Sequence, residues 1–255
     1  MGPLETQWFP LLTGAGLVLA ALVFFALFFV SAPYGRHARP GWGPSLNSRL
    51  AWMLMEFPSP AVFLACFLWG HGAQGGCVWA LVLLWLIHYT HRAFIFPLRL
   101  HEHARRTPLL IVLFAILFNV FNGYLNGRYL GLHAADYGPA WIAGPRFLLG
   151  ALGFAAGFAI NLHADQVLIA LRRPGETAYK IPRGGFYRWV SCPNYLGELI
   201  EWSGWALATW SLPGLSFALW TAANLIPRAR AHHAWYRRQF PDYPPGRTAI
   251  LPFLF

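Results

Sequence analysis

Long apolar blocks dominate this sequence, and four of them cover residues 8–30, 78–97, 108–130 and 147–171. Each block reaches the ~20 residues that an α-helix needs to cross the hydrocarbon core of a bilayer. Only 11% of the 255 residues are charged, whereas soluble domains carry roughly a quarter. The sequence therefore predicts an all-α, polytopic membrane protein.

Two further apolar blocks, 50–70 and 195–225, are interrupted by acids or prolines. The second is too long for one span, and the Ser-Leu-Pro-Gly segment at 211–214 is a natural turn that divides it in two. This gives seven predicted transmembrane helices. Glycines four residues apart, at 123, 127 and 131 and at 153 and 157, predict close packing between helices. Since Glu5 stands where a signal peptide has positive charge, we expect the first helix to stay in the mature protein.

Positive charge falls in alternate connections between these helices. Of the 19 Lys and Arg residues, 16 lie in segments 31–50, 98–107, 172–194 and 228–255, and the intervening segments 71–77, 132–144 and 211–214 have none. The positive-inside rule then predicts that the N-terminus is outside and the C-terminus cytoplasmic, as seven crossings require. Because topology accounts for most of the net charge of +10, the charge does not indicate a nucleic-acid partner.

The basic segment 172–194 has a composition of its own. Contact with anionic lipid headgroups is the simpler explanation for basic loops. Here, however, five cations alternate with glycine, tyrosine and asparagine. Such a mixture suits a loop that wraps a polyphosphate.

Two polar stripes flank this basic loop, each at helical spacing on one face of a predicted helix. Their members are Asn161, Asp165, Leu168 and Arg172 before the loop, and Asn194, Glu198 and Glu201 after it. Ionisable groups inside spans are costly, so each is a functional candidate. The two stripes predict a water-accessible site for a charged ligand on the cytoplasmic side; the alternative is that they pair with each other between helices.

Glu56 stands alone among apolar neighbours in a predicted span. Desolvation favours the neutral carboxyl, which can donate a hydrogen bond. Tyr89 brings a phenol to the same cytoplasmic half of another span, although a buried tyrosine is usually only a packed aromatic with a satisfied hydroxyl.

The histidines and cysteines do not predict a metal site. Histidine boxes of membrane di-iron enzymes have spacings such as HxxxH and HxxHH, and the close pairs here are His88-x-x-His91, His101-x-His103 and His232-His233. The three cysteines, Cys66, Cys77 and Cys192, have neither metal nor redox spacing. A Rossmann fingerprint is not present either, because Gly14-Ala15-Gly16 lies inside the first apolar block.

The C-terminal third carries a series of specific motifs. They are LRRPGE at 171–176, YKIPRGG at 179–185, NYLGELIEW at 194–202, ALATWSLP at 206–213, DYP at 242–244 and PFLF at 252–255. On these motifs the chain resembles the steroid 5α-reductase family, most of all its type 2 members, and we expect a bacterial homologue. The resemblance is near-continuous from about residue 145, with shorter matches at YGRH 34–37, at AW 51–52 with Glu56, and at HYTHR 88–92.

The resemblance implies a seven-helix fold forming one membrane-embedded domain over residues 1–255. Helices 1–4, within 1–131, would hold the lipid substrate, and helices 5–7 with the C-terminal tail, within 132–255, would hold NADPH at the cytoplasmic side. We expect a multi-pass monomer that binds a steroid or steroid-like lipid and membrane lipid, without metal or nucleic acid.

Matched by position, Glu56 and Tyr89 correspond to the family's catalytic pair, which hydrogen-bonds the 3-oxo group of the substrate. The positions that match cofactor contacts are Arg36, Trp52, Arg92, Asn161, Asp165, Arg172, Tyr179, Lys180, Asn194, Glu198, His232, Tyr236 and Arg247. Two residues depart from the mammalian members: Met55 replaces Gln, and Lys180 replaces Arg, which keeps the charge but loses bidentate geometry.

The implied reaction is that of a 3-oxo-5α-steroid 4-dehydrogenase, in which NADPH reduces the C4=C5 bond of a Δ4-3-ketosteroid. An enone accepts hydride once its carbonyl is polarised, and Glu56 and Tyr89 would supply the donors. Three alternatives remain: a trans-2-enoyl-CoA reductase of lipid elongation, an isoprenylcysteine methyltransferase that uses S-adenosylmethionine, and a non-catalytic lipid-binding or transport protein whose acids move protons.

Overall fold

The computed structural model describes residues 3–31, 33, 35–37, 39, 41–70, 76–100, 106–172, 176 and 178–254. Several residues in the motifs and loops named above lie outside this part of the chain. Among them are Tyr34, His101, His103, Arg105, Arg173, Pro174, Gly175 and Phe255.

The described chain is predominantly helical. Its α-helices are α1 (Pro3–Phe29), α2 (Ser48–Glu56), α3 (Pro58–Trp69), α4 (Trp79–Thr90), α5 (Phe96–Arg99), α6 (Leu109–Leu132), α7 (Pro139–Ile142), α8 (Pro145–Ala170), α9 (Pro193–Thr209) and α10 (Leu212–Gln239). Short 3₁₀ turns form at η1 (Gly35–His37), η4 (Ala134–Asp136) and η5 (Gly185–Arg188), and η3 (His91–Ile95) is a π-helix. Strands β1 (Ser45–Asn47) and β2 (Arg106–Pro108) pair antiparallel, a small sheet that the all-α expectation did not include.

Five helical segments are long and apolar enough to cross a membrane, which confirms the polytopic prediction. They are Leu4–Phe29, Ser48–Trp69, Trp79–Arg99, Leu109–Leu132 and Pro145–Ala170, and they coincide with the first five predicted blocks. Two of them are composite: α2 continues into α3 at Pro58, and α4 continues through η3 into α5.

The last predicted block forms α9 and α10, but the turn between them differs from the expected one. The break falls at Trp210, whose φ of 47° is left-handed, and at Ser211, whose hydroxyl accepts from the Gly214 amide. Leu212 and Pro213 already belong to the first turn of α10, a position where proline loses no helical hydrogen bond. Helix α10 then continues to Gln239, well beyond the predicted end of the block at 225.

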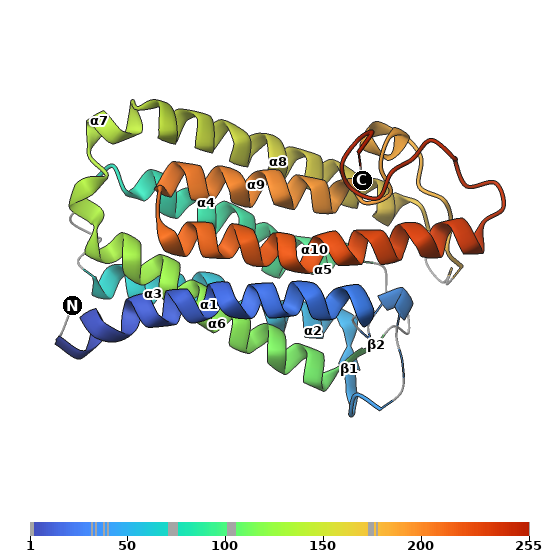
Figure 1. Cartoon of the computed structure of the whole chain (residues 1–255), viewed down its shortest axis with the longest axis horizontal. Helices are drawn as coiled ribbons and strands as arrows, with labels where there is room; N and C mark the ends of the chain where they lie inside the picture. The colour runs from blue at the N-terminus through green and yellow to red at the C-terminus, as the bar shows by residue number, and fades with distance from the viewer. Residues whose placement is uncertain are drawn as a thin grey trace.

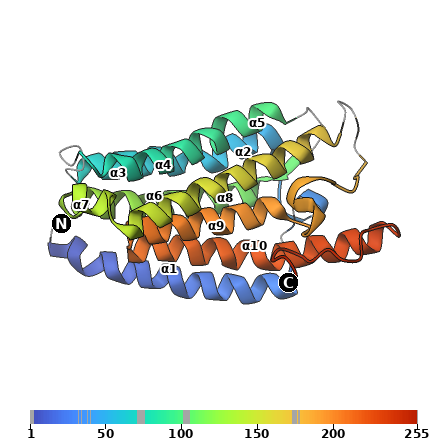
Figure 2. The ribbon, with the colours of Figure 1, turned by 90° about the horizontal axis from the view of Figure 1, so that it is seen from above.

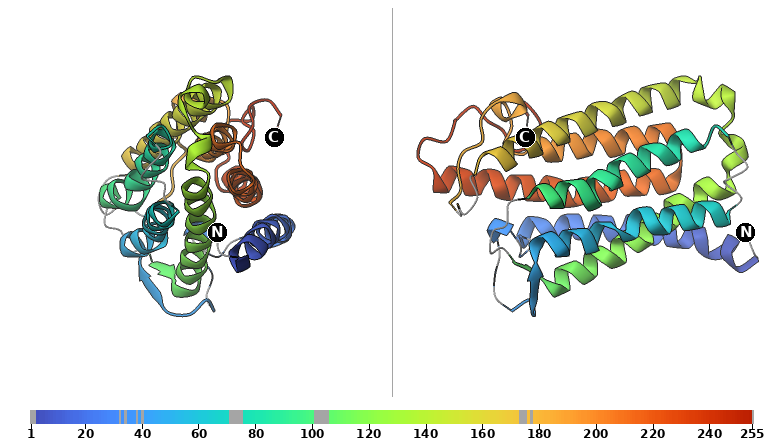
Figure 3. Two further views of the ribbon diagram at one scale, coloured as in Figure 1. Left: turned by 90° about the vertical axis from the view of Figure 1, so that its left-hand side faces the viewer. Right: turned by 180° about the vertical axis from the view of Figure 1, so that it is seen from behind.

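The long helices lie side by side along one axis, with α1 against α10 and α8 against α9 (Figures 1 and 2). Figure 3 places α1 at the edge of the bundle. Helix α7 and the start of α1 lie at one end, whereas β1, β2 and the segments that follow α8 and α10 gather at the other (Figure 1). The described parts of the four basic connections therefore meet at one end of the bundle.

Glycines bring two helix pairs into close contact, as their spacing predicted. A Cβ on Gly127 of α6 would lie 2.2 Å from the Phe63 carbonyl oxygen of α3. A Cβ on Gly157 of α8 would lie 2.3 Å from the Glu201 amide nitrogen of α9. Both distances are too short for any side chain, so glycine at these positions is what lets the backbones touch.

A side chain of α2 completes the hydrogen bonding at the end of the π-helix. The amide of Phe96, the residue after the π-helix, donates to the His91 carbonyl five residues back. In the same register the next amide would serve the Arg92 carbonyl, but residue 97 is proline and has no N–H. The indole of Trp52 donates to that carbonyl at 3.1 Å instead. Helix α2 is thereby held against the segment that carries Tyr89 and Arg92.

Candidate functional site

One cavity of about 1270 Å³ lies between the helices. This exceeds the ~300–1,000 Å³ of ordinary small-molecule pockets, so it has room for two ligands. Apolar side chains of α1, α6 and α10 line one part of it, among them Leu19, Val23 and Leu27 on α1, Phe118 on α6 and Trp220 on α10.

The other part of the cavity is polar and carries more cations than acids. The arginines that line it are Arg36, Arg49, Arg92, Arg106, Arg172 and Arg228, and the acids are Glu56, Asp165 and Glu198. An apolar chamber joined to a cationic one can hold a lipid beside a polyanion.

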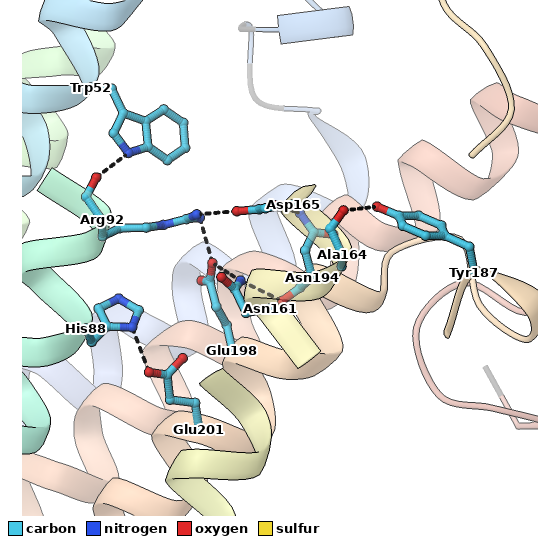
Figure 4. Close-up of polar contacts among 10 residues, drawn as sticks. All are labelled: Trp52, His88, Arg92, Asn161, Ala164, Asp165, Tyr187, Asn194, Glu198 and Glu201. Atoms are coloured by element: carbon cyan, nitrogen blue, oxygen red, sulfur yellow. Dashed lines mark hydrogen bonds and ion pairs between the residues drawn. The ribbon is translucent and has the colours of Figure 1, made fainter. Parts of the chain in front are cut away.

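Arg92 is the centre of the polar part (Figure 4). Its guanidinium donates to Asp165 Oδ2 of α8 at 2.8 Å and to Glu198 Oε1 of α9 at 2.7 Å. The Asn161 amide donates to the same Glu198 oxygen at 3.1 Å, and the Asn194 amide lies 3.3 Å from Asp165 Oδ1. The two predicted polar stripes therefore meet across the glycine-lined α8–α9 interface, and Arg92 of η3 joins them.

Glu201, the last member of the second stripe, contacts His88 instead of Arg92. Its carboxyl Oε1 shares a hydrogen bond of 2.7 Å with His88 Nδ1, and both side chains are buried. His88 lines the cavity, whereas Glu201 does not. The expectation that Glu201 shares the charged-ligand site with Asn194 and Glu198 is therefore wrong, and its partner His88 was not predicted as a site residue.

Glu56 and Tyr89 line the same cavity, as expected for residues that act on one ligand. The charged neighbours of Glu56 are Arg92 and Glu198, and the phenol of Tyr89 interacts with Glu56 in turn. The Tyr89 ring packs on Trp85 and Trp202, with centroid distances of 5.0 and 5.9 Å.

Aromatic rings surround the cations at the end of the bundle. The Arg36 guanidinium lies over the rings of Tyr179, Trp235 and Tyr236, and donates to the Tyr236 hydroxyl at 3.3 Å. Arg172 also lies over Tyr179, at 4.7 Å. The segment after α8 is thus fixed to η1 and to α10.

His37 and His232 stack with a centroid distance of 5.1 Å and share a hydrogen bond of 3.0 Å between their rings. Desolvation and the neighbouring Arg36 lower the pKa of His37, which keeps its ring neutral. The other ring nitrogen of His232 meets the Tyr195 hydroxyl at 3.1 Å.

Four predicted cofactor residues do not line the cavity: Asn161, Lys180, Tyr236 and Arg247. Asn161 and Tyr236 contact residues that do. Lys180 is partly exposed and pairs with Glu176 at 2.5 Å. Arg247 is buried and donates to the Pro182 carbonyl at 2.9 Å, but its Nε and Nη1 have no hydrogen-bond partner among the described residues.

Two polar residues of the cavity, Asn224 and Arg228, were not predicted from the sequence. Asn224 and Arg228 of α10 line it beside His232. With Tyr236 these residues stand four apart, which places them along one side of a helix. That spacing was a usable signal, but the segment from 228 onward was interpreted as a basic connection.

Among the described residues, no group of three or more His, Cys, Asp or Glu side chains is arranged to hold a metal ion. The polar part of the cavity instead offers arginines, amides and aromatic rings.

Comparison with known proteins identifies the family. The family model described as 3-oxo-5-alpha-steroid 4-dehydrogenase matches residues 105–255. The chain is 43% identical to "Steroid 5-alpha-reductase DET2" of Gossypium hirsutum over 244 residues, which cover 93% of this chain and 94% of the relative.

Animal relatives match over a similar length. The chain is 43% identical to "3-oxo-5-alpha-steroid 4-dehydrogenase 1" of Bos taurus, covering 92% of this chain and 93% of the relative. The protein of the same name from Homo sapiens is also 43% identical, covering 87% and 86%. These names are of type 1 and plant members, so the particular likeness to type 2 members stays a prediction. The chain belongs to the 3-oxo-5-alpha-steroid 4-dehydrogenase family.

Proposed function

We propose that this protein is a membrane oxidoreductase that acts on a CH–CH group, reducing the C4=C5 bond of a Δ4-3-ketosteroid with NADPH. The observation that carries the proposal is the continuous cavity that joins Glu56 and Tyr89 to a chamber rich in arginine. Its apolar part suits a steroid, and the names of the relatives agree with that substrate class.

The roles of Glu56 and Tyr89 follow from the chemistry of an enone. Hydride addition at the β carbon moves negative charge onto the carbonyl oxygen. Two hydrogen-bond donors at that oxygen stabilise the resulting enolate in a water-poor site. Glu56 in its neutral form and the phenol of Tyr89 are the donors, and a proton from solvent then adds to the α carbon.

When bound, NADPH supplies the hydride. The polar chamber fits such a group, because six arginines line it and Nη1 of one of them, Arg36, is buried without a hydrogen-bond partner among the described residues. Buried guanidinium nitrogens normally find acceptors, and phosphate oxygens are suitable ones. The residues that would hold the cofactor are Arg36, Trp52, Arg92, Asn161, Asp165, Arg172, Tyr179, Lys180, Asn194, Glu198, His232, Tyr236 and Arg247.

The topology proposed with this function has seven spans, the last two being α9 and α10, in one domain over residues 1–255. The alternation of basic connections supports a cytoplasmic C-terminus and an outside N-terminus. The nucleotide chamber would then face the cytoplasm, where NADPH is available. We propose that the protein works as a monomer.

The first test is turnover by the purified protein in detergent or nanodiscs. With NADPH and a panel of Δ4-3-ketosteroids, we expect 5α-reduced products and matching oxidation of NADPH. A trans-2-enoyl-CoA and a steroid without the 3-oxo group serve as controls and should not react. Reduction of the enoyl-CoA with no steroid turnover would replace the proposed reaction with that of lipid elongation.

A second prediction concerns cofactor choice. Arg172 lines the polar chamber, and a cation there favours the extra phosphate of NADPH over NADH. We expect kcat/KM to be higher with NADPH, and Arg172→Ala to lower this preference by roughly tenfold, the effect of one lost charge-assisted hydrogen bond. Arg183→Ala is the matched control, because Arg183 lies in the same segment, is mostly exposed and does not line the cavity. Equal use of both cofactors by the wild-type protein would contradict the assignment.

A further inference from the structure

A chain of buried side chains leads from α9 through α6 to the phenol of Tyr89. The Trp205 indole donates to Asn126 Oδ1 at 2.9 Å, and Asn126 Nδ2 donates to Asn122 Oδ1 at 3.0 Å. Trp205, Asn126 and Asn122 are all at most 4% exposed. These residues have no place in the function proposed so far.

The donor and acceptor roles in this series of hydrogen bonds are fixed by Trp205, where the series starts. An indole nitrogen can only donate a hydrogen bond, whereas a side-chain amide has one accepting and one donating end. Trp205 therefore requires the oxygen of Asn126 to face it, which turns the Asn126 nitrogen toward Asn122. The oxygen of Asn122 is used in turn, so its nitrogen is the free donor at the other end of the chain.

That free donor lies beside Tyr89. Asn122 and Ser59 are the uncharged polar side chains that lie beside the phenol. Asn122 Nδ2 and Ser59 Oγ are buried and have no hydrogen-bond partner among the described residues. Helix α3 approaches α6 closely at this point, because a Cβ on Gly123 would lie 2.8 Å from the Ser59 carbonyl oxygen. A buried donor without a partner is costly, and the oxygen of Tyr89 is the acceptor within its reach.

Aromatic packing holds both ends of the chain in place. Trp85 contacts the Trp205 ring at 5.1 Å and the Tyr89 ring at 5.0 Å. The start of the chain and the phenol at its end are therefore packed against the same indole.

We propose that Trp205, Asn126 and Asn122 position the hydroxyl hydrogen of Tyr89 toward the substrate. A phenol has one hydrogen to donate and lone pairs to accept with. When Asn122 donates to the Tyr89 oxygen, the Tyr89 hydrogen is directed to the cavity, where the carbonyl of the substrate would accept it. This inference rests on the proposed role of Tyr89 and assigns Asn122 as a positioning residue.

The key variant is Asn122→Leu, which keeps a branched side chain of similar size and removes its donor. We expect kcat to fall on the order of tenfold, while the Kd of the ketosteroid for the enzyme with oxidised cofactor changes less than about twofold. In a Tyr89→Phe background the same substitution should cause no further loss, because Asn122 acts only through the phenol.

Trp205→Phe tests the start of the chain, since it removes the N–H and keeps an aromatic ring. Tyr137→Phe is its matched control: it also deletes a buried donor, the one to the Thr209 carbonyl at 2.8 Å, but outside the chain. We expect lower kcat in Trp205→Phe and wild-type kcat in Tyr137→Phe. This pair decides the question if Asn122→Leu does not fold.

The outcomes separate this inference from the proposed function. If Tyr89→Phe itself keeps the wild-type kcat, the proposed role of Tyr89 is wrong. If Tyr89→Phe loses activity while folded Asn122→Leu or Trp205→Phe does not, only the positioning chain is wrong. A full additional loss from Asn122→Leu in the Tyr89→Phe background would also overturn it, because that result means a structural effect independent of the phenol.

Discussion

Tyr89→Phe is expected to lower kcat by about 10²-fold, the usual cost of removing one donor from an oxyanion site. The ring and its packing on Trp85 and Trp202 remain, so the protein should fold and bind NADPH as the wild type does. Single-turnover hydride transfer and NADPH affinity, measured on the same preparation, separate these two quantities.

Glu56→Gln is the companion variant. It keeps a donor of similar shape but loses acidity, so kcat should fall with little change in NADPH affinity. The double variant should lose less than the product of the two single losses, because both donors serve one oxygen and act as a unit. A folded, NADPH-binding Glu56→Gln protein that turns over at the wild-type rate would remove Glu56 from the mechanism.

Asp165→Ala and Glu198→Ala should abolish turnover mainly through cofactor binding. Arg92 pairs with both carboxylates, so removal of one acid leaves a balanced ion pair and the fold should survive. We expect the Kd for NADPH to rise by about 10²-fold or more, the scale for loss of a buried charged partner.

Thermal stability in detergent and NADPH binding should be measured together for these variants. Asp136→Ala is the control, since Asp136 is exposed and pairs with nearby His133. An Asp165 or Glu198 variant that binds NADPH with wild-type affinity shows that the residue is wrongly assigned.

Helical periodicity was sufficient to predict half of the polar site. Asn161 and Asp165 on one helix, and Asn194 and Glu198 on the next, were placed on single faces by their spacing, and those faces meet. The glycine at 157 was predicted to bring helices together, and it lies within this interface. Local patterns succeed here because both stripes lie on regular helices that follow each other in the chain.

Hydropathy could not predict where α10 ends or that Arg92 is central. Apolar patterns report where a helix leaves the hydrocarbon region, but α10 continues to Gln239 as a polar helix. The partners of Arg92 lie 73 and 106 residues away in sequence, and no local pattern encodes such a pairing. The Trp205–Asn126 hydrogen bond was not predicted either, because its two residues lie 79 positions apart in the sequence.

The π-helix at His91–Ile95 makes this part of the chain tolerant of a change in length. An α-helix advances about 100° per residue, and a π-turn takes up one residue more than an α-helical turn. Deletion of a single residue within this segment would therefore restore a regular helix, while α4 with Tyr89 and the following α5 keep their directions. The same deletion in a regular helix such as α6 or α8 would turn the two parts of that helix against each other by about 100°.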